Sequence, residues 1–121
     1  MEGRQTKSYK DLIVWQRSVQ LVTAVYDLTR MFPKEEIYGI SSQMRRAVIS
    51  IPSNIAEGRS RGTRKDYLQF LRVAFASGSE LETQIKLVKN LYSKNEYPCQ
   101  NVDNLLDEVM RMLNKMISSM K

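Results

Sequence analysis

A helical repeat that continues from Tyr67 to Tyr92 constrains the fold of this chain more than any other feature. Apolar or small residues recur there at alternating steps of four and three, at positions 67, 71, 74, 78, 81, 85, 88 and 92. Such spacing places one apolar stripe along a helix in coiled-coil-like packing. Gly78 lies in this stripe at a cost of about 1 kcal/mol relative to alanine. Close approach of a neighbouring backbone would offset that cost, so we predict one long helix packed against others.

Three further segments have the apolar spacing of helices, and they cover residues 12–32, 35–57 and 101–120. Pro33 is expected to end the first and Gly58 to stop the second, while Asn101 is a good N-cap for the last. Thr63 is expected to cap the long helix. The alternation of a strand and the turn of a hairpin are both absent from the sequence. The chain is therefore predicted to be an all-α, antiparallel, up-down-up-down four-helix bundle.

Pro52 lies in the middle of the second predicted helix. Its nitrogen has no hydrogen to donate to the Val48 carbonyl, and its ring clashes with the preceding turn, so a kink near Pro52 is expected. Alternatively, one helix stops near Ile51 and another begins at Pro52, where proline is favourable. The apolar spacing continues through Ile55, which favours one kinked helix.

Length and composition describe a single domain of ordinary globular type. The 121 residues are 42% apolar and 26% charged, and they contain no repeat or low-complexity tract. The longest apolar runs are far shorter than the ~20 residues that span a bilayer, and the polar first residues do not resemble a secretory signal. We therefore expect one cytoplasmic domain over residues 1–121, with no membrane partner and with residues 1–8 disordered.

The first helix carries two apolar stripes. One stripe consists of Val14, Leu21, Val25, Leu28 and Phe32, and the other consists of Trp15, Val19, Val22 and Tyr26. A helix that is apolar over most of its circumference is buried on more than one side. The second stripe is therefore a candidate oligomer interface. The alternative is a wide stripe that is wedged deep in the core of a monomer.

Three blocks of the sequence form a specific pattern from residue 9 to about residue 92. They read "YKDLIVWQRSVQL", "VYDLTRMFPKEEIYGISSQMRRAVISIPSNIAEG" and "DYLQFLRVAFASGSELETQI". The pattern resembles the 23S rRNA intervening-sequence proteins, a fold group that includes the accessory variability determinant of diversity-generating retroelements. Ile40 departs from it by standing where leucine is expected. The resemblance implies a four-helix bundle that assembles into a ring, a homopentamer, and the retroelement member binds nucleic acid and a reverse transcriptase.

The distribution of basic residues says more about partners than the formal net charge of +6. Several follow Gly58 in a predicted loop, and two more lie upstream on the second helix. They are candidates for contacting RNA or DNA phosphates with little sequence preference: Arg45, Arg46, Arg59, Arg61, Arg64 and Lys65. Alternatively, the loop is solvated and its arginines pair with Glu57 or Asp66, in surface pairs worth about 0–1 kcal/mol.

Enzymatic activity is not expected, and no catalytic residue, metal ligand or cofactor is assigned. The chain has no histidine, and its one cysteine, Cys99, therefore lacks the usual activating base. Phosphate-binding glycine motifs are absent. Metal sites in bundles combine glutamates with a Glu-x-x-His pair. Glu57 and Glu80 are therefore predicted to have structural roles, by pairing with arginines or capping backbone.

These observations favour a non-enzymatic, oligomeric accessory or scaffold protein that binds the phosphate backbone of nucleic acid through a basic rim. The alternative is a scaffold for protein–protein interaction whose basic residues have no nucleic-acid role. Electrostatic binding would weaken steeply as salt rises, whereas apolar docking would not, so the two functions can be separated experimentally.

Overall fold

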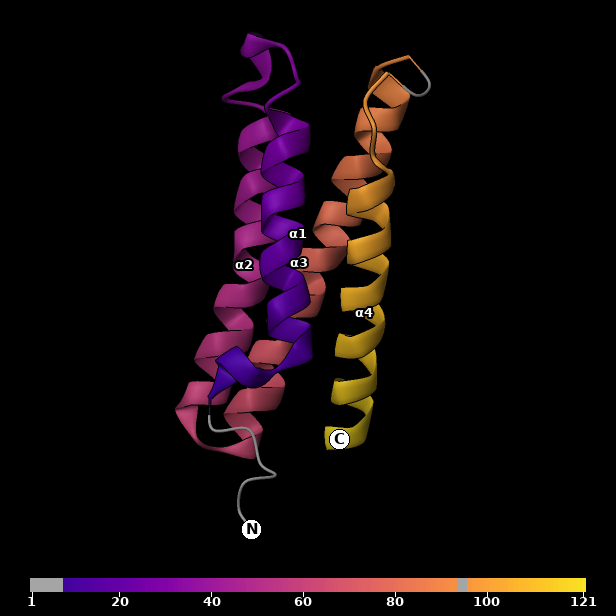
Figure 1. The fold of residues 1–121 in the computed structure, drawn as a ribbon. Helices are drawn as coiled ribbons and strands as arrows, with labels where there is room; N and C mark the ends of the chain where they lie inside the picture. The colour runs from indigo at the N-terminus through magenta and orange to yellow at the C-terminus, as the bar shows by residue number, and fades with distance from the viewer. Residues whose placement is uncertain (1–7, 94–95) are drawn as a thin grey trace.

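A computed structural model describes residues 8–93 and 96–121 of the chain, and these residues form four long helices (Figure 1). A short 3₁₀ helix, η2, precedes the first long helix, and a second one, η3, follows it. The elements in chain order are η2 (Tyr9–Asp11), α1 (Ile13–Thr29), η3 (Lys34–Glu36), α2 (Ile40–Arg61), α3 (Arg64–Leu91) and α4 (Gln100–Met120). The described ranges contain no strand, and the all-α prediction is confirmed. The predicted disorder of residues 1–8 lies outside the described residues, except at Ser8.

The four helices form the predicted antiparallel bundle. α1 packs against α2 and α4, and α3 packs against the same two helices, so α1 and α3 face each other diagonally. Consecutive helices run in opposite directions (Figure 1). The start of α1, the α2–α3 connection and the end of α4 therefore lie together, and we call this the turn end. The opposite end, which holds η3, is the far end.

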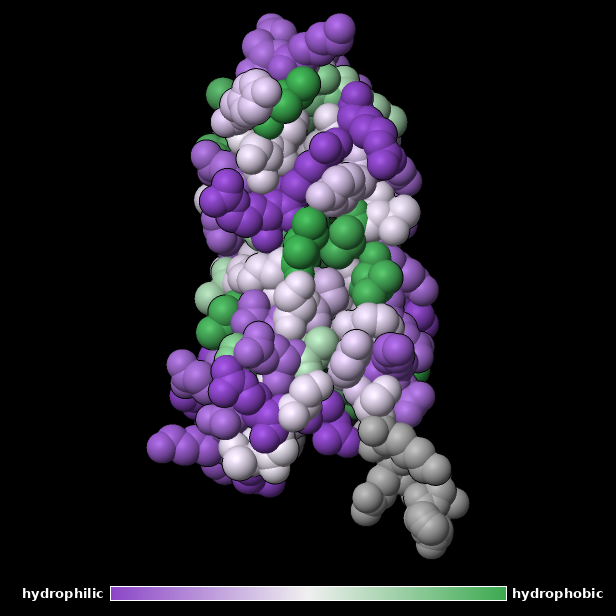
Figure 2. Space-filling view, turned by 90° about the vertical axis from the view of Figure 1, so that its left-hand side faces the viewer, coloured by the Kyte–Doolittle hydropathy of each residue, from purple (hydrophilic) through white to green (hydrophobic). Residues whose placement is uncertain are grey.

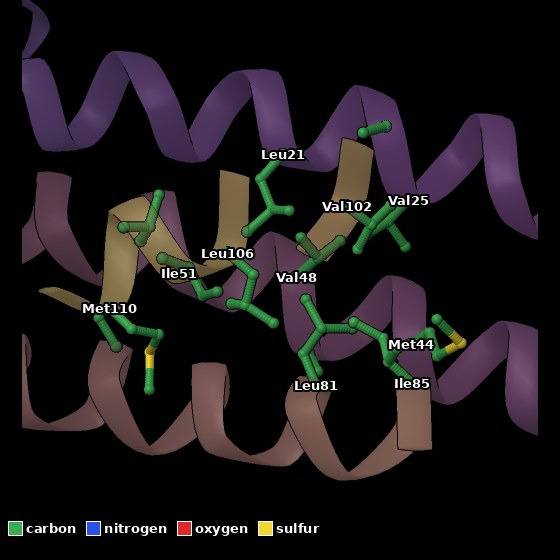
Figure 3. Close-up of a cluster of buried hydrophobic side chains, with 14 of the residues drawn as sticks. Leu21, Val25, Met44, Val48, Ile51, Leu81, Ile85, Val102, Leu106 and Met110 are labelled. Carbon is green, nitrogen blue, oxygen red and sulfur yellow. The ribbon is translucent and has the colours of Figure 1, made fainter. Parts of the chain in front are cut away.

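The long helical repeat supplies one wall of the core, as predicted. Its members are buried from Leu71 to Val88, and Tyr67 and Tyr92 are half-buried at its two ends. In Figure 3 two members of the repeat, Leu81 and Ile85, point into the core that the other three helices share. The partners labelled there include Leu21 of α1, Val48 of α2 and Leu106 of α4. The first predicted stripe is also fully part of this core: Val14, Leu21, Val25 and Leu28 lie on α1, and Phe32 lies in the segment after it.

Gly58 does not stop the second helix, so that prediction is wrong. α2 continues to Arg61 and is capped by Gly62, whose φ of 90° lies in the left-handed region. Gly58 is buried where α2 meets α3, and a Cβ placed on it would lie 2.6 Å from the Cβ of Phe70. The glycine therefore permits the two helices to approach each other closely.

Gly78 also lies at a close contact, but its neighbour differs from the prediction. A Cβ placed on Gly78 would overlap the sulfur of Met110, which extends from α4. The expectation of an approaching backbone is therefore wrong. Met110 is buried, and its flexible thioether occupies the space that a larger residue at position 78 would need.

Other helix boundaries also differ from the predictions. The first helix ends at Thr29, where the hydroxyl donates to the Val25 carbonyl, rather than at residue 32. The second begins at Ile40, because residues 34–36 form η3 instead. Cys99 rather than Asn101 precedes the last helix. The cap predicted for the long helix is confirmed, since the Thr63 hydroxyl accepts a hydrogen bond from the Asp66 N–H at 3.1 Å.

Pro52 is accommodated within one helix. α2 runs through it without a break, so the alternative of two separate helices is wrong, and the ribbon of α2 changes direction about halfway along its length (Figure 1). Polar side chains beside the proline bond to the backbone and to α3. The Asn54 amide donates to the Ser50 carbonyl at 2.7 Å, and the hydroxyls of Ser50 and Ser77 lie 2.8 Å apart.

The far end is closed by three aromatic rings. Phe32 from the segment after α1 packs edge-on against Tyr97, and Tyr97 packs edge-on against Tyr92. The Tyr92 hydroxyl donates to Glu36 Oε2 at 2.6 Å. That hydrogen bond, together with burial, raises the pKa of Tyr92 to about 12. The negative charge of Glu36 is therefore held by a partner within the fold.

Gln84 provides a test of how polar groups affect the stability of this core. The residue is 4% exposed, its amide nitrogen donates to Glu80 Oε2 at 3.4 Å, and no protein group donates to its oxygen. A buried acceptor without a partner costs about 1–3 kcal/mol. Gln84→Met, which preserves the shape, should therefore raise the free energy of unfolding by about 1–2 kcal/mol in urea titrations.

The matched control for Gln84→Met is Gln69→Met, because Gln69 is an exposed glutamine of the same helix. That variant should change the free energy of unfolding by less than about 0.5 kcal/mol. If both variants gained the same free energy of unfolding, the cause would be helix propensity rather than the buried oxygen.

Candidate nucleic-acid interface

Four of the predicted nucleic-acid contacts gather at the turn end. Arg59 and Arg61 belong to the last turn of α2, and Arg64 and Lys65 belong to the first turn of α3. The prediction that these cations lie in a loop is therefore wrong, because only Gly62 and Thr63 separate the two helices. A connection this short places the four cations at one end of the bundle.

Arg64 and Arg61 make contacts within the fold that bear on their availability to a ligand. Arg64 donates to the carbonyls of Ser119 and Met120 at 3.3 Å, and so it satisfies backbone groups at the end of α4. Arg61 donates to Glu57 Oε2 at 3.1 Å, and its guanidinium lies 4.9 Å from the centre of the Phe70 ring. The Arg61 side chain is nevertheless 49% exposed. A surface ion pair is worth about 0–1 kcal/mol, so a phosphate can compete with Glu57 for Arg61.

Arg59 and Tyr67 line the same concavity at the turn end. Burial raises the pKa of Tyr67, and the positive charge of Arg59 partly opposes that rise. The concavity is lined by Gly58, Arg59, Gly62, Thr63, Arg64, Tyr67 and Met120. It therefore combines two guanidinium groups with a phenol, which are all groups that can donate hydrogen bonds to a phosphate.

Arg45 and Arg46 do not belong to this cluster. Arg45 Nε donates to the Thr29 hydroxyl at 2.8 Å, and its guanidinium lies 4.4 Å from the centre of the Tyr26 ring, so it ties α2 to α1. Arg46 is exposed, but its place on α2 is about 20 Å from Arg59 at 1.5 Å per residue. The six predicted residues therefore occupy two separate places on the molecule.

Sequence reasoning missed Lys10, which joins the basic cluster. Lys10 is an exposed residue of η2, a short helix that packs against both α1 and α2 at the turn end. Ser8 caps η2 by accepting from the Lys10 N–H at 3.1 Å, and Gln16 donates to the Lys10 carbonyl at 2.9 Å. A three-residue 3₁₀ helix has no periodic signal, so nothing in the sequence placed this lysine.

An apolar groove follows the face between α1 and α2, and we call it the α1–α2 groove. Its lining is Tyr9, Trp15, Val19, Val22, Ile49, Pro52, Ser53 and Ala56. Val19 is 38% exposed and Ile49 is 42% exposed, and hydrophobic residues gather near the middle of this face in Figure 2. Three of the four predicted interface residues therefore line one surface. Tyr26 is not among the residues that line the groove. The Arg45 guanidinium lies over the Tyr26 ring.

The described part of the chain contains neither a cluster of possible metal ligands nor a helix able to span a membrane. Residues 8–93 and 96–121 contain no cluster of three or more histidine, cysteine or acidic side chains that could bind a metal ion. Within the same ranges, none of the helices combines the length and the apolar character that a bilayer span requires.

The chain matches one protein family in sequence and a solved structure in fold. Residues 10–115 match the family model described as 23S rRNA-intervening sequence protein. The fold matches the crystal structure of a protein of unknown function from the S23 ribosomal protein family of Bacteroides thetaiotaomicron VPI-5482, with a TM-score of 0.77 and 22% sequence identity. The match covers 87% of this chain and 98% of that one, and it shows a shared fold. No curated protein matches the chain.

Proposed function

Because the chain belongs to the 23S rRNA-intervening sequence protein family, we propose that it is a non-enzymatic accessory protein that binds the phosphate backbone of nucleic acid. The observation that carries this proposal is the cluster of Arg59, Arg61, Arg64 and Lys65 around a two-residue connection. Lys10 adds a fifth cation from the start of the chain. Together these side chains form a basic surface that a polyanion can approach from outside the bundle.

The two ends of the bundle differ in charge. At the far end, Lys34 stands beside Glu35 and Glu36, so cations and anions are mixed. Among the described residues of the turn end, the basic Lys10, Arg59, Arg61, Arg64 and Lys65 outnumber the acidic Asp11, Glu57 and Asp66. Each phosphate that a cation neutralises releases counterions from the nucleic acid. A basic surface of this kind favours contacts to the backbone over the reading of bases.

Assembly into a ring is the second part of the proposal. The α1–α2 groove exposes contiguous apolar side chains from two helices, including Val19, Ile49 and Pro52. A second copy that buries this groove would repeat the turn end in every subunit. A homopentamer would then present five basic ends, and its attraction for nucleic acid in the cytoplasm would exceed that of one chain.

Nucleic-acid binding is tested by fluorescence anisotropy with a labelled structured RNA and a labelled DNA duplex. If the turn end neutralises three phosphates, affinity should fall about 40-fold between 50 and 200 mM salt. The triple variant Arg59→Gln, Arg61→Gln, Lys65→Gln should lose at least about tenfold at 50 mM salt. Arg64 is left in place because it bonds to the end of α4.

The matched control removes the same number of charges elsewhere. Arg30→Gln, Lys34→Gln, Arg46→Gln changes three exposed cations outside the turn end. This variant should retain most of the affinity. Equal losses in the two triple variants would show a response to net charge alone. The absence of salt-sensitive binding at 50 mM would reject the nucleic-acid role.

A scaffold that binds only proteins is the second candidate function. It is favoured by exposed apolar residues at the far end, where Met31 and Ile37 are each 52% exposed and Tyr38 is 96% exposed. Contiguous apolar exposure is typical of protein-binding surfaces. Binding through such a surface would be insensitive to salt, which distinguishes this function in the same titration.

A further inference from the structure

The α1–α2 groove and the basic turn end meet at one aromatic residue, Tyr9. We propose that Tyr9 stacks on an unpaired base and makes the site selective for single-stranded nucleic acid over duplex. This inference rests on the proposed nucleic-acid binding and names the form of nucleic acid that the turn end accepts.

Tyr9 is held in place by its surroundings. It begins η2, which packs against both α1 and α2, and its ring lies 5.2 Å from the ring of Trp15 in an edge-on arrangement. The hydrogen bond from Gln16 to the Lys10 carbonyl fixes the next residue of η2 to the first turn of α1. A ring that is fixed before binding loses little conformational freedom when a ligand stacks on it.

The chemistry beside Tyr9 suits a nucleotide. Tyr9 lines a concavity together with Ala56, Glu57, Ser60 and Arg61. An aromatic ring offers a stacking face to a base, the Arg61 guanidinium can bond to the adjoining phosphate, and the Ser60 hydroxyl can bond to either sugar or base. An aromatic side chain beside a cation is the combination used for binding single strands.

The requirement for an unpaired base follows from the geometry of stacking. In a duplex both faces of an internal base are covered by neighbouring base pairs, so an aromatic side chain can stack only on bases that are splayed out of the helix. Phosphates, in contrast, are accessible in both forms. Arg59, Arg64 and Lys65 should therefore contact either form, while Tyr9 should add affinity only for the single strand.

The single tryptophan of the chain makes the proposal measurable. Trp15 is the only tryptophan and is in contact with Tyr9. Binding of a mixed-sequence 12-nucleotide single strand at Tyr9 should therefore change Trp15 emission, and the blunt duplex of the same sequence should change it much less. In anisotropy titrations the single strand should bind about tenfold more tightly than the duplex.

Variants of Tyr9 separate stacking from a structural role. Tyr9→Ala should lose about tenfold in affinity for the single strand and keep its affinity for the duplex, which also shows that the basic end is still folded. Tyr9→Phe should retain single-strand affinity, because it keeps the stacking face. Tyr38→Ala is the control, since Tyr38 is 96% exposed at the far end.

Two outcomes would overturn the inference and leave nucleic-acid binding intact. One is salt-sensitive binding that is equal for single strand and duplex and unchanged by Tyr9→Ala. The other is Trp15 emission that does not change when anisotropy shows the single strand to be bound, because the strand would then bind away from Tyr9. If neither nucleic acid binds at 50 mM salt, the proposed function and this inference fail together.

Discussion

The assembly proposed through the α1–α2 groove should be abolished by Ile49→Asp, which should leave single chains of 14.1 kDa. Ile49 is 42% exposed and lies in the α1–α2 groove, so a second copy that buries the groove would bury the new carboxylate. An unpaired charge at a buried contact costs about 3–5 kcal/mol, and a ring repeats that cost at every interface. Light scattering coupled to size-exclusion chromatography measures the change in mass.

Val73→Asp is the matched control for the assembly experiment. Val73 is 40% exposed on α3 and lies outside the groove, so the same change in chemistry is made at nearly the same exposure. The control should keep the mass of the unmodified protein. An unmodified protein that already elutes as a 14.1-kDa chain would contradict assembly through the groove. Dissociation of both variants would instead indicate a general effect of added charge.

Gly58→Val should lower the free energy of unfolding by about 3 kcal/mol, the upper part of the range for overpacked cores. The clash at position 58 is with the Cβ of Phe70, at 2.6 Å. That atom is attached directly to the backbone of α3, so relief requires the two helices to separate. Thermal unfolding followed by circular dichroism should show a midpoint lower by about 12 °C.

Two comparisons isolate the effect at Gly58. Gln43→Val adds the same β-branched side chain at an exposed position of α2 and should change stability by less than about 1 kcal/mol. Gly78→Ala should be milder than Gly58→Ala, because the obstacle at position 78 is the flexible thioether of Met110. A Gly58→Val midpoint equal to that of Gln43→Val would contradict the close α2–α3 contact.

The helices and their antiparallel order could be predicted from the sequence because the signal extends over many residues. The apolar stripe from Tyr67 to Tyr92 covers about seven turns, and the stripe of α1 follows the same steps from Leu21 to Leu28. A single residue that departs from the pattern does not alter the predicted secondary structure of such a long segment. The stripe therefore identified buried residues such as Leu81 and Val88 without any knowledge of their partners.

Helix ends were less predictable because a local signal can have two meanings. Gly58 and Gly62 are both followed by polar, basic residues, and either can end a helix. Only the position of Phe70 on α3 shows that the first is required for packing and the second for the turn. The sequence is therefore equally consistent with a helix end at Gly58 and with one at Gly62.

The candidate site was only partly predictable because its residues come from different elements. The four cations near Gly62 are close in sequence, and they remain close in the fold. Arg45 and Arg46 are neighbours in the sequence, but the contacts of Arg45 with Thr29 and Tyr26 depend on how α1 lies against α2. The groove likewise pairs Val19 with Ile49, which are thirty positions apart in the chain.

The two-residue connection at Gly62 and Thr63 also bears on the order in which the chain folds. α2 and α3 share the most extensive helix–helix packing in the described structure, and they are joined by the shortest connection. Closing a short loop costs little chain entropy, so contacts between sequence neighbours form early. The α2–α3 hairpin is therefore expected to form the folding nucleus, onto which α1 and α4 later dock from opposite ends of the sequence.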